Sequence, residues 1–225
     1  MLKIQKVSVQ IAGIRVLRDI ATEFTAGSLL AVVGRNGAGK TTLLRAIMGL
    51  IPLQHGRIEF DGVDLASVPG HQRSSLGIGY APEDRVMFPT FSVEDNLRFP
   101  CDVLGLPKGQ IDERLEQVLL AVPQLKVMLP RSGSALSGGQ GKIAALGRAL
   151  MAGRRLVLLD EPFQGLAPIL AGEYAESLRK LRDINPKLCV VVTESNRSLL
   201  RDLPDATLTL ERGELMAAND ANAAH

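Results

Sequence analysis

The pattern of hydrophobic and polar positions divides the chain into strand-like and helix-like segments. Residues 2–11 (LKIQKVSVQI) alternate polar and apolar side chains, as a strand with one buried face does. Residues 28–34 (SLLAVVG), 155–162 (RLVLLDEP) and 188–195 (LCVVVTES) contain continuous apolar runs, which are typical of strands buried on both faces. Two further strand-like stretches lie at 56–62 and 206–215.

Helical patterns lie between these strands and fill the middle third of the chain. The segment TTLLRAIMGL follows the second strand, and another helical stretch separates 155–162 from 188–195. Within about 83–148, Ser92 and Asp95 have the spacing of a capping box at the start of a short helix. One apolar helical face there comprises Ile111, Leu115, Val118, Leu119 and Val122. Strands that alternate with helices predict an α/β core with a mostly parallel sheet, and the middle third predicts an inserted helical lobe.

A glycine-rich motif, GRNGAGKTT, connects the predicted strand at 28–34 to a predicted helix. It comprises Gly34, Arg35, Asn36, Gly37, Ala38, Gly39, Lys40, Thr41 and Thr42. In this strand–turn–helix context the backbone N–H groups can wrap phosphates, and the helix N-terminus adds partial positive charge. Lys40 can reach the β- and γ-phosphates of ATP, and Thr41 can hold Mg²⁺. Taken alone, the motif predicts a nucleotide triphosphatase or a kinase.

Two adjacent acids, Asp160 and Glu161, end the apolar run at 155–162. Charged side chains are costly inside a sheet, so we expect the pair at its carboxyl edge, where α/β proteins bind ligands. Asp160 fits the role of supporting Mg²⁺, and Glu161 fits the residue that polarises the attacking water. A helix cap followed by proline explains Asp160 in part, but it does not explain two adjacent acids.

The stretch LSGGQ introduces a second turn before a helix and includes Ser137, Gly138, Gly139 and Gln140. Such a helix terminus can bind an anion, yet the chain already has one phosphate loop. The economical explanation is a dimer in which this turn meets the ATP that the other chain holds. A plain flexible turn is the alternative, which the position just before the Asp-Glu strand disfavours.

Taken together, GRNGAGKTT, LSGGQ and LVLLDEP resemble the Walker A motif, signature and Walker B motif of ATP-binding subunits of ABC transporters. The resemblance covers nearly the whole chain. It implies one domain, 1–225, with a RecA-like P-loop NTPase core, an N-terminal antiparallel β part and an inserted helical subdomain. The core would comprise 1–82 and 149–225, the helical subdomain about 83–148, and 216–225 would be a disordered tail.

The segment GIGYAPEDRVMFPTFSVEDNL and the sequence GLAP are similar to the branched-chain amino acid importer branch of that family. Glu83 falls where most members have a glutamine that meets the metal and the water. We therefore expect Glu83 to ligate Mg²⁺ or to accept from the water, with Mg²⁺ offsetting its charge. The alternative is a solvated loop acid.

Two other positions depart from the family pattern. Ile11 occupies the position of the aromatic residue that stacks on adenine, and an aliphatic side chain offers no π-face. Ser195 occupies the position of the γ-phosphate-sensing histidine, and its hydroxyl is a shorter, single donor. We expect weaker adenine binding and slow intrinsic hydrolysis. If the alignment is shifted by one residue, Glu194 or Asn196 contributes instead.

Composition narrows the setting. The chain has 225 residues, 46% of them hydrophobic, and a net charge of only +2, which lacks the basic footprint of a nucleic-acid binder. No apolar run approaches the length of a membrane span, so a role at the cytoplasmic face of the membrane would work through partners. The resemblance implies permease subunits, a second ATP-binding subunit and, indirectly, an external solute-binding protein.

An alternative function remains open at this stage. A soluble, non-transport ABC module would use ATP-driven dimerisation as a regulatory clamp, and Ile11 and Ser195 favour it mildly. The intact residues Lys40, Asp160 and Glu161 and the LSGGQ stretch argue for an ATPase that hydrolyses. The sequence does not name the solute, since urea, short amides and aromatic acids are all compatible with it.

Overall fold

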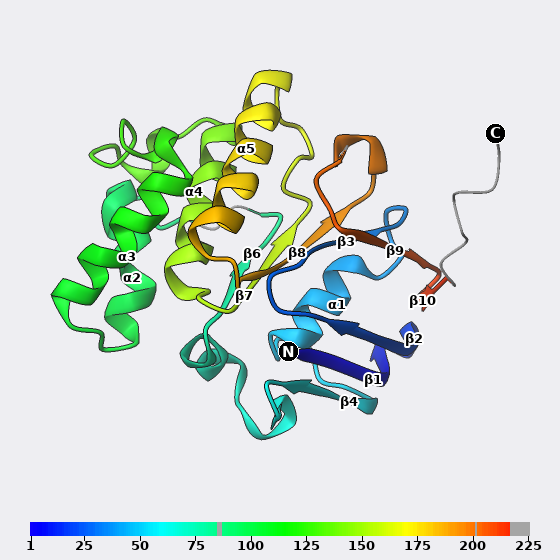
Figure 1. The fold of residues 1–225 in the computed structure, drawn as a ribbon. Helices are drawn as coiled ribbons and strands as arrows, with labels where there is room; N and C mark the ends of the chain where they lie inside the picture. Colours follow the sequence, from blue (N-terminus) through cyan, green and yellow to red (C-terminus); the bar gives the residue numbers. More distant parts are fainter. Residues whose placement is uncertain (85–86, 201, 217–225) are drawn as a thin grey trace.

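Two β-sheets form the framework of the computed structural model, which describes residues 1–84, 87–200 and 202–216 (Figure 1). The larger sheet has six strands in the order β10-β9-β3-β8-β7-β6. All of its neighbouring strands are parallel except β9 and β10, which form an antiparallel pair. The strands are β3 (Leu29–Val33), β6 (Ile78–Ala81), β7 (Leu156–Asp160), β8 (Cys189–Glu194), β9 (Ala206–Glu211) and β10 (Glu214–Leu215).

The smaller sheet is antiparallel and has the order β2-β1-β4-β5. Its strands are β1 (Leu2–Ile11), β2 (Ile14–Phe24), β4 (His55–Phe60) and β5 (Val63–Asp64). In β1 the apolar residues Leu2, Ile4, Val7 and Val9 are buried, whereas the polar residues between 2 and 6 are exposed. This period of two places one face of the sheet against the core.

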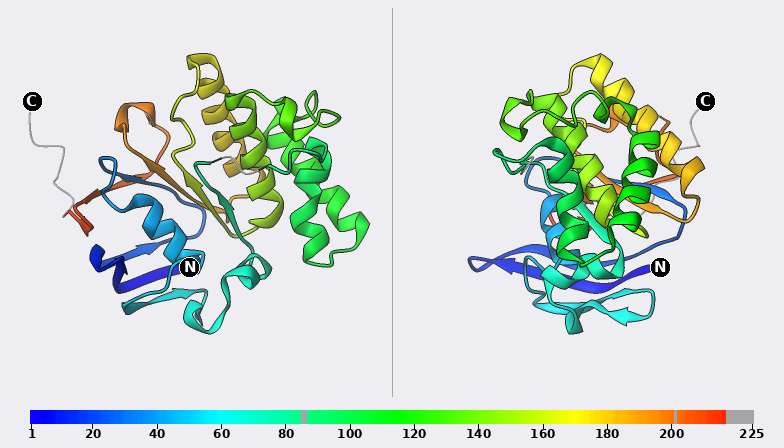
Figure 2. Two further views of the ribbon diagram at one scale, coloured as in Figure 1. Left: turned by 180° about the vertical axis from the view of Figure 1, so that it is seen from behind. Right: turned by 90° about the vertical axis from the view of Figure 1, so that its left-hand side faces the viewer.

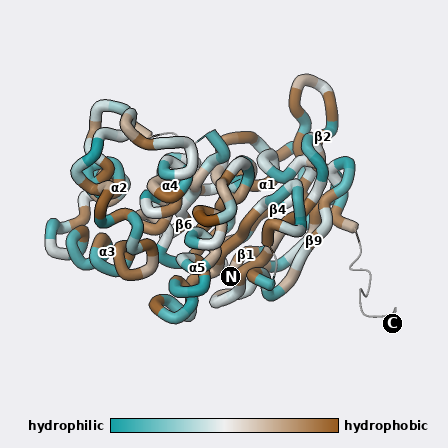
Figure 3. The backbone as a smooth tube through the Cα atoms, turned by 90° about the horizontal axis from the view of Figure 1, so that it is seen from above, coloured by the Kyte–Doolittle hydropathy of each residue, from teal (hydrophilic) through white to brown (hydrophobic). Residues whose placement is uncertain are grey.

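Helix α1 (Lys40–Ile47) lies between the two sheets (Figure 1). Its buried residues Leu43, Leu44 and Ile47 belong to one apolar cluster with side chains of β1, β2 and β4 and of β3, β7 and β8. The helix therefore packs on both sheets, which fixes the position of its N-terminus. Figure 3 shows hydrophobic positions along the central strands and hydrophilic positions on outer turns.

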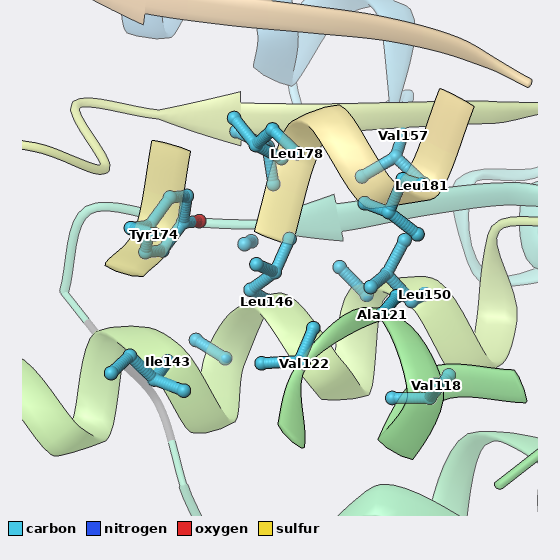
Figure 4. Packing of buried hydrophobic residues seen from close by; sticks show 14 of the residues in the cluster. Val118, Ala121, Val122, Ile143, Leu146, Leu150, Val157, Tyr174, Leu178 and Leu181 are labelled. Atoms are coloured by element: carbon cyan, nitrogen blue, oxygen red, sulfur yellow. The ribbon is translucent and has the colours of Figure 1, made fainter. Parts of the chain in front are cut away.

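The other face of the larger sheet is covered by helices (Figure 2). They are α2 (Val93–Val103), α3 (Lys108–Ala121), α4 (Gly138–Ala152) and α5 (Pro168–Ile184). Within the buried cluster, Val157 of β7 contributes to the packing with Leu146 of α4 and Leu178 of α5 (Figure 4). Burying one leucine side chain stabilises a fold by roughly 2 kcal/mol, so this layer is a major source of stability.

Strand β7 shows why the apolar runs are continuous. Leu156 and Leu158 point into the cluster around α1, while Val157 and Leu159 point into the cluster under α4 and α5. Both faces of the strand are buried, as the sequence predicts for a parallel sheet covered on both sides.

The structure confirms the predicted α/β fold with a mostly parallel sheet, an antiparallel sheet and helices from the middle third. The capping box is present, because Ser92 accepts from the N–H of Asp95 and the Asp95 carboxylate accepts from the N–H of Ser92. The boundaries of the core and of the helical subdomain stay predictions. The predicted tail, 216–225, lies outside the described residues except for Met216.

Short 3₁₀ turns complete the connections, and none of the helices in the described part of the chain combines the length and hydrophobicity of a membrane span. The turns span Leu65–Ser67, Gly70–Leu76, Pro123–Leu125, Gly133–Ala135 and Arg197–Leu199.

Buried Arg73 anchors the C-terminal end of α1. Its guanidinium donates to the backbone oxygens of Ala46 and Ile47 in α1, and to those of Leu65 and Val68 in the following segment. Burial lowers the pKa of this group from its ordinary value, so the carbonyl bonds must offset the desolvation. A positive charge at this end also complements the helix dipole.

We expect Arg73→Met to lower the free energy of unfolding by about 3 kcal/mol, because buried carbonyl groups lose charged donors. Urea unfolding followed by circular dichroism measures this. Arg179→Met is the matched control, since Arg179 is half exposed and makes only a 3.7 Å contact with Glu176. Equal stability of the two variants would contradict the anchoring role.

Candidate functional site

The phosphate loop, Gly34–Gly39, connects the end of β3 to the start of α1. Gly37 and Gly39 have φ angles of 81° and 110°, which side chains rarely allow. A Cβ atom on Gly39 would lie 2.7 Å from Leu17 Cδ2, and one on Gly34 would lie 2.2 Å from the Leu210 carbonyl oxygen. The spacing of these glycines is therefore set by the close approach of β2 and β9 to the loop.

A cavity of about 330 Å³ opens over this loop at the carboxyl ends of β3 and β7. Its lining comprises Val16, Asn36, Gly37, Gly39, Lys40, Thr41, Thr42, Glu83, Glu161 and Gln164. The N-terminus of α1 meets the cavity, so backbone N–H groups and the helix dipole favour an anion there. The two predicted acids in this lining come from different segments, since Glu83 follows β6 and Glu161 follows β7.

The Lys40 ammonium forms a buried ion pair with Glu161. The distance from Nζ to Oε1 is 3.0 Å, and both side chains are no more than 5% exposed. Nζ also donates to the backbone oxygens of Gly34 at 2.6 Å and Arg35 at 3.1 Å. A buried charge pair needs such additional bonds to offset its desolvation.

The second carboxylate oxygen of Glu161 is held by Ser195. Glu161 Oε2 accepts from the Ser195 N–H at 3.0 Å and from its hydroxyl at 3.2 Å. The Glu161 backbone has a φ of 47°, and its N–H donates to the backbone oxygen of Thr193 at 3.1 Å. The structure thus brings together three of the predicted catalytic residues, Lys40, Glu161 and Ser195.

Asp160 lies beside this pair and accepts three hydroxyl donors. Its Oδ1 accepts from Thr41 at 3.1 Å and from Thr193 at 2.7 Å, and its Oδ2 accepts from Tyr80 at 3.3 Å. Burial, and secondarily the charge of Asp160, raises the pKa of the Tyr80 hydroxyl, which stays protonated. The two predicted Mg²⁺ ligands, Thr41 and Asp160, therefore sit in direct contact at the edge of the phosphate cavity.

These hydroxyl and carboxylate oxygens are hard donors, which suit Mg²⁺. The described residues contain no group of three or more His, Cys, Asp or Glu side chains that could hold a metal. The donor set fits a magnesium ion that takes the rest of its ligands from phosphate oxygens and water.

The signature residues lie elsewhere. Ser137 caps α4, accepting from the Gln140 N–H, while the Gln140 side chain accepts from the Ser137 N–H at 3.1 Å. Arg131 donates to the same Gln140 oxygen. A Cβ on Gly139 would lie 2.5 Å from Leu170. None of the residues Ser137, Gly138, Gly139 and Gln140 is among those that line the phosphate cavity of this chain.

Ile11 is at the tip of the β1–β2 hairpin, paired with Ile14, and is 42% exposed. It does not line the phosphate cavity, whereas Val16 in the next strand does. The Asn196 side chain accepts from the N–H of Ser198 and caps a 3₁₀ turn. Its oxygen is therefore engaged in local structure, while Ser195 faces Glu161.

Sequence reasoning missed several residues of the site. Val16 and Gln164 line the cavity, Tyr80 and Thr193 bind Asp160, and the Lys142 ammonium donates to the Glu161 backbone oxygen at 2.6 Å. Thr193 had a usable signal, because it is a polar residue inside an otherwise apolar strand. The others depend on contacts between distant segments.

Comparison with known proteins places this geometry in a family. Residues 17–164 match the family described as ABC transporter. A probable branched-chain amino acid transport ATP-binding protein LivF from Archaeoglobus fulgidus is 32% identical, over 99% of this chain and 93% of its own length. The high-affinity branched-chain amino acid transport ATP-binding protein BraG from Pseudomonas aeruginosa is 33% identical, over 96% of this chain and 91% of its own. The lipopolysaccharide export system ATP-binding protein LptB from Escherichia coli is 32% identical, over 91% of this chain and 84% of its own.

Solved structures agree in fold. A structure described as the ATP-binding subunit of an ABC transporter superposes with a TM-score of 0.83 and 26% identity, over 96% of this chain and 88% of the other. A dimeric bacterial ABC transporter cassette gives a TM-score of 0.83 at 21% identity, over 96% of this chain and 97% of the other.

Proposed function

Because the chain belongs to the ABC transporter family and is an ATP-binding ATPase of that family, we propose that it serves an import system for branched-chain amino acids or a related small polar solute. The observation that carries the catalytic part is the buried chain of contacts from Lys40 through Glu161 to Ser195, beside the Thr41–Asp160 pair. The importer part is supported by two relatives that match nearly the whole chain.

The reaction converts ATP and water to ADP and phosphate. The loop N–H groups and Lys40 would bind the β- and γ-phosphates, and Lys40 would then exchange part of its bond with Glu161 for phosphate oxygens. Glu161, held on its other oxygen by Ser195, would accept a hydrogen bond from the attacking water and orient it. Thr41 and Asp160 would hold Mg²⁺, which supplies charge neutralisation at the phosphates.

Glu83 would act at the same cavity from the opposite segment. It lines the cavity together with Lys40 and Thr41, so a carboxylate lies across from the phosphate loop. We propose that it binds Mg²⁺ directly or through water and that the metal offsets its charge.

We expect Glu83→Gln to raise the half-saturating Mg²⁺ concentration for ATP hydrolysis by about fivefold, or about 1 kcal/mol, because one negative charge is removed. Titration of the initial rate with Mg²⁺ at saturating ATP measures this. Asp84→Asn, one residue away, controls for general charge in the loop. An unchanged Mg²⁺ dependence and rate in Glu83→Gln would show that Glu83 is a solvated loop acid.

We propose that two ATP-binding subunits sandwich two nucleotides, with the signature turn of each facing the nucleotide of the other. Ser137 lies at the N-terminus of the 15-residue helix α4, and no signature residue lines the phosphate cavity of its own chain. The turn is thus available as a second anion site. The γ-phosphate and the metal would hold this closed state, and hydrolysis would release it.

We expect Glu161→Gln to retain ATP binding, to lose hydrolysis by about 100-fold or more, and to form an ATP-dependent dimer, because water is no longer oriented. Size-exclusion chromatography with light scattering, with and without Mg-ATP, measures the dimer. Adding Ser137→Arg should return the protein to a monomer, whereas Ser75→Arg on a distant 3₁₀ turn should not. A monomer in all conditions at high concentration would count against a homodimer, and rapid hydrolysis by the isolated wild-type chain would count against the assigned role of Ser195.

An exposed aromatic group suits a membrane partner. Phe88, Phe91 and Phe99 are 37–39% exposed, and Phe88 packs against the other two rings at centroid distances of 5.2 and 4.8 Å. Buried Asn96 fixes the loop by bonding to the N–H and the carbonyl of Phe88. We propose that this patch, close in sequence to Glu83, contacts cytoplasmic helices of permease subunits.

Affinity purification of the tagged chain from native membranes, followed by mass spectrometry, tests the importer function. We expect two polytopic permease subunits, a second ATP-binding subunit and, more weakly, an external solute-binding protein. Phe91→Ser with Phe99→Ser should lose the permeases, because the aromatic surface is removed, whereas Val127→Ser, 80% exposed elsewhere, should keep them.

The other outcomes have distinct meanings. Recovery of export components would move the protein to the branch that contains the export relative. Recovery of soluble proteins alone would favour an ATP-driven regulatory clamp over transport.

A further inference from the structure

Glu194, the last residue of β8, is a fully buried carboxyl group with an unsatisfied oxygen. Its side chain is 0% exposed. Oε1 accepts from the Phe163 N–H at 2.8 Å, whereas no N–H or O–H group of the described residues donates to Oε2. An ionised carboxylate in this setting would be costly, because it has lost water at one oxygen without replacement.

The neighbours of Glu194 come from four segments. Lys142 approaches from α4, Tyr174 from α5, Glu161 from the turn after β7, and Ser195 is next in the chain. Figure 4 shows Tyr174 on α5 in the same apolar layer as Ile143 and Leu146. The carboxyl groups of Glu194 and Glu161 are within hydrogen-bonding reach. Two carboxyl groups can bond to each other only when one of them carries a proton.

The proton resides on Glu194. Burial raises the pKa of Glu194 to about 8, the charge of Glu161 adds to this rise, and the Phe163 N–H and Lys142 oppose it. Glu161 differs because Lys40 and Ser195 bind its two oxygens and favour its ionised form. At neutral pH the pair therefore consists of one carboxylic acid and one carboxylate.

We propose that Glu194 is a positioning residue for ATP hydrolysis, whose protonated carboxyl donates a hydrogen bond to the Glu161 carboxylate and holds it toward the nucleotide. The inference rests on the proposed role of Glu161 as the residue that orients water. Glu194 does not meet the nucleotide, and it acts through Glu161.

The geometry explains why a third contact is useful. Lys40 holds one oxygen of Glu161, but the same ammonium would turn to phosphate oxygens when ATP binds. Ser195 offers two donors to the other oxygen, and the Glu161 backbone has an unfavourable φ of 47°. A donor from below the site keeps the carboxylate in place at the moment when Lys40 is shared.

The arrangement predicts a loss of function at alkaline pH. Above about pH 8, Glu194 ionises, the donor disappears and two buried carboxylates repel each other. The folded pKa is raised above the unfolded value, so the stabilising proton is present at low pH and is lost as the pH rises through about 8. Both the hydrolysis rate and the resistance to unfolding should therefore fall over this range.

The test measures kcat and KM for ATP, and the thermal unfolding midpoint, of the full chain from about pH 6 to about pH 10. For the wild type we expect kcat to fall by about threefold or more between pH 7 and pH 9, with KM unchanged, because only the orientation of water suffers. Glu194→Gln supplies an amide donor at every pH, so it should hydrolyse ATP at pH 7 and lack this alkaline fall. Glu194→Leu should lose about tenfold or more in kcat at every pH while remaining folded.

Glu116→Gln, an exposed change on α3, is the matched control and should follow the wild type. Parallel kcat and unfolding profiles of the wild type and Glu194→Gln would overturn the inference. Glu161→Gln separates the two hypotheses. If it hydrolyses ATP normally, the proposed role of Glu161 fails and the positioning role fails with it. If it is inactive while Glu194→Gln keeps the alkaline fall, only the inference about Glu194 fails.

Discussion

The buried ion pair between Lys40 and Glu161 is the constraint on which the site depends. Its two charges come from segments that are 121 positions apart, one at the start of α1 and one after β7. Such a pair contributes little net stability, because its attraction must first offset the loss of water around both charges. The surrounding groups follow from that cost. The carbonyls of Gly34 and Arg35 receive the spare ammonium protons, and Ser195 satisfies the second carboxylate oxygen.

The two sheets and the helical layer serve to hold these segments at fixed distances. Helix α1 is packed on both sheets, and its far end is bonded by Arg73. Strands β7 and β8 are in register, with Asp160 opposite Thr193, so the residues that follow them emerge side by side. The order of strands thus converts two separate apolar runs in the sequence into one edge that carries Asp160, Glu161, Glu194 and Ser195.

Local signals in the sequence were sufficient for the elements and the motifs but not for the contacts between them. The apolar runs predicted β3, β7 and β8 because both faces of these strands are buried, and the capping box at Ser92 predicted the start of α2. Strands β2 and β6 received no prediction. Of 11 residues in β2, only Leu17, Ile20 and Phe24 are buried, and β6 has only four residues, so neither has a strong pattern. Tyr80, Lys142 and Arg73 bind groups on distant segments, which no local pattern encodes.

The phosphate loop is also tied to a late part of the chain. The N–H of Gly213 donates to the Ala38 carbonyl, and the Gly213 carbonyl accepts from the N–H of Arg18. A Cβ on Gly213 would lie 2.2 Å from the Val16 carbonyl oxygen, so this contact is tight. During synthesis on the ribosome the loop emerges long before its last neighbour. The nascent protein therefore acquires its finished nucleotide site only when the turn between β9 and β10 has left the exit tunnel, which makes ATP binding a report on completed translation and folding.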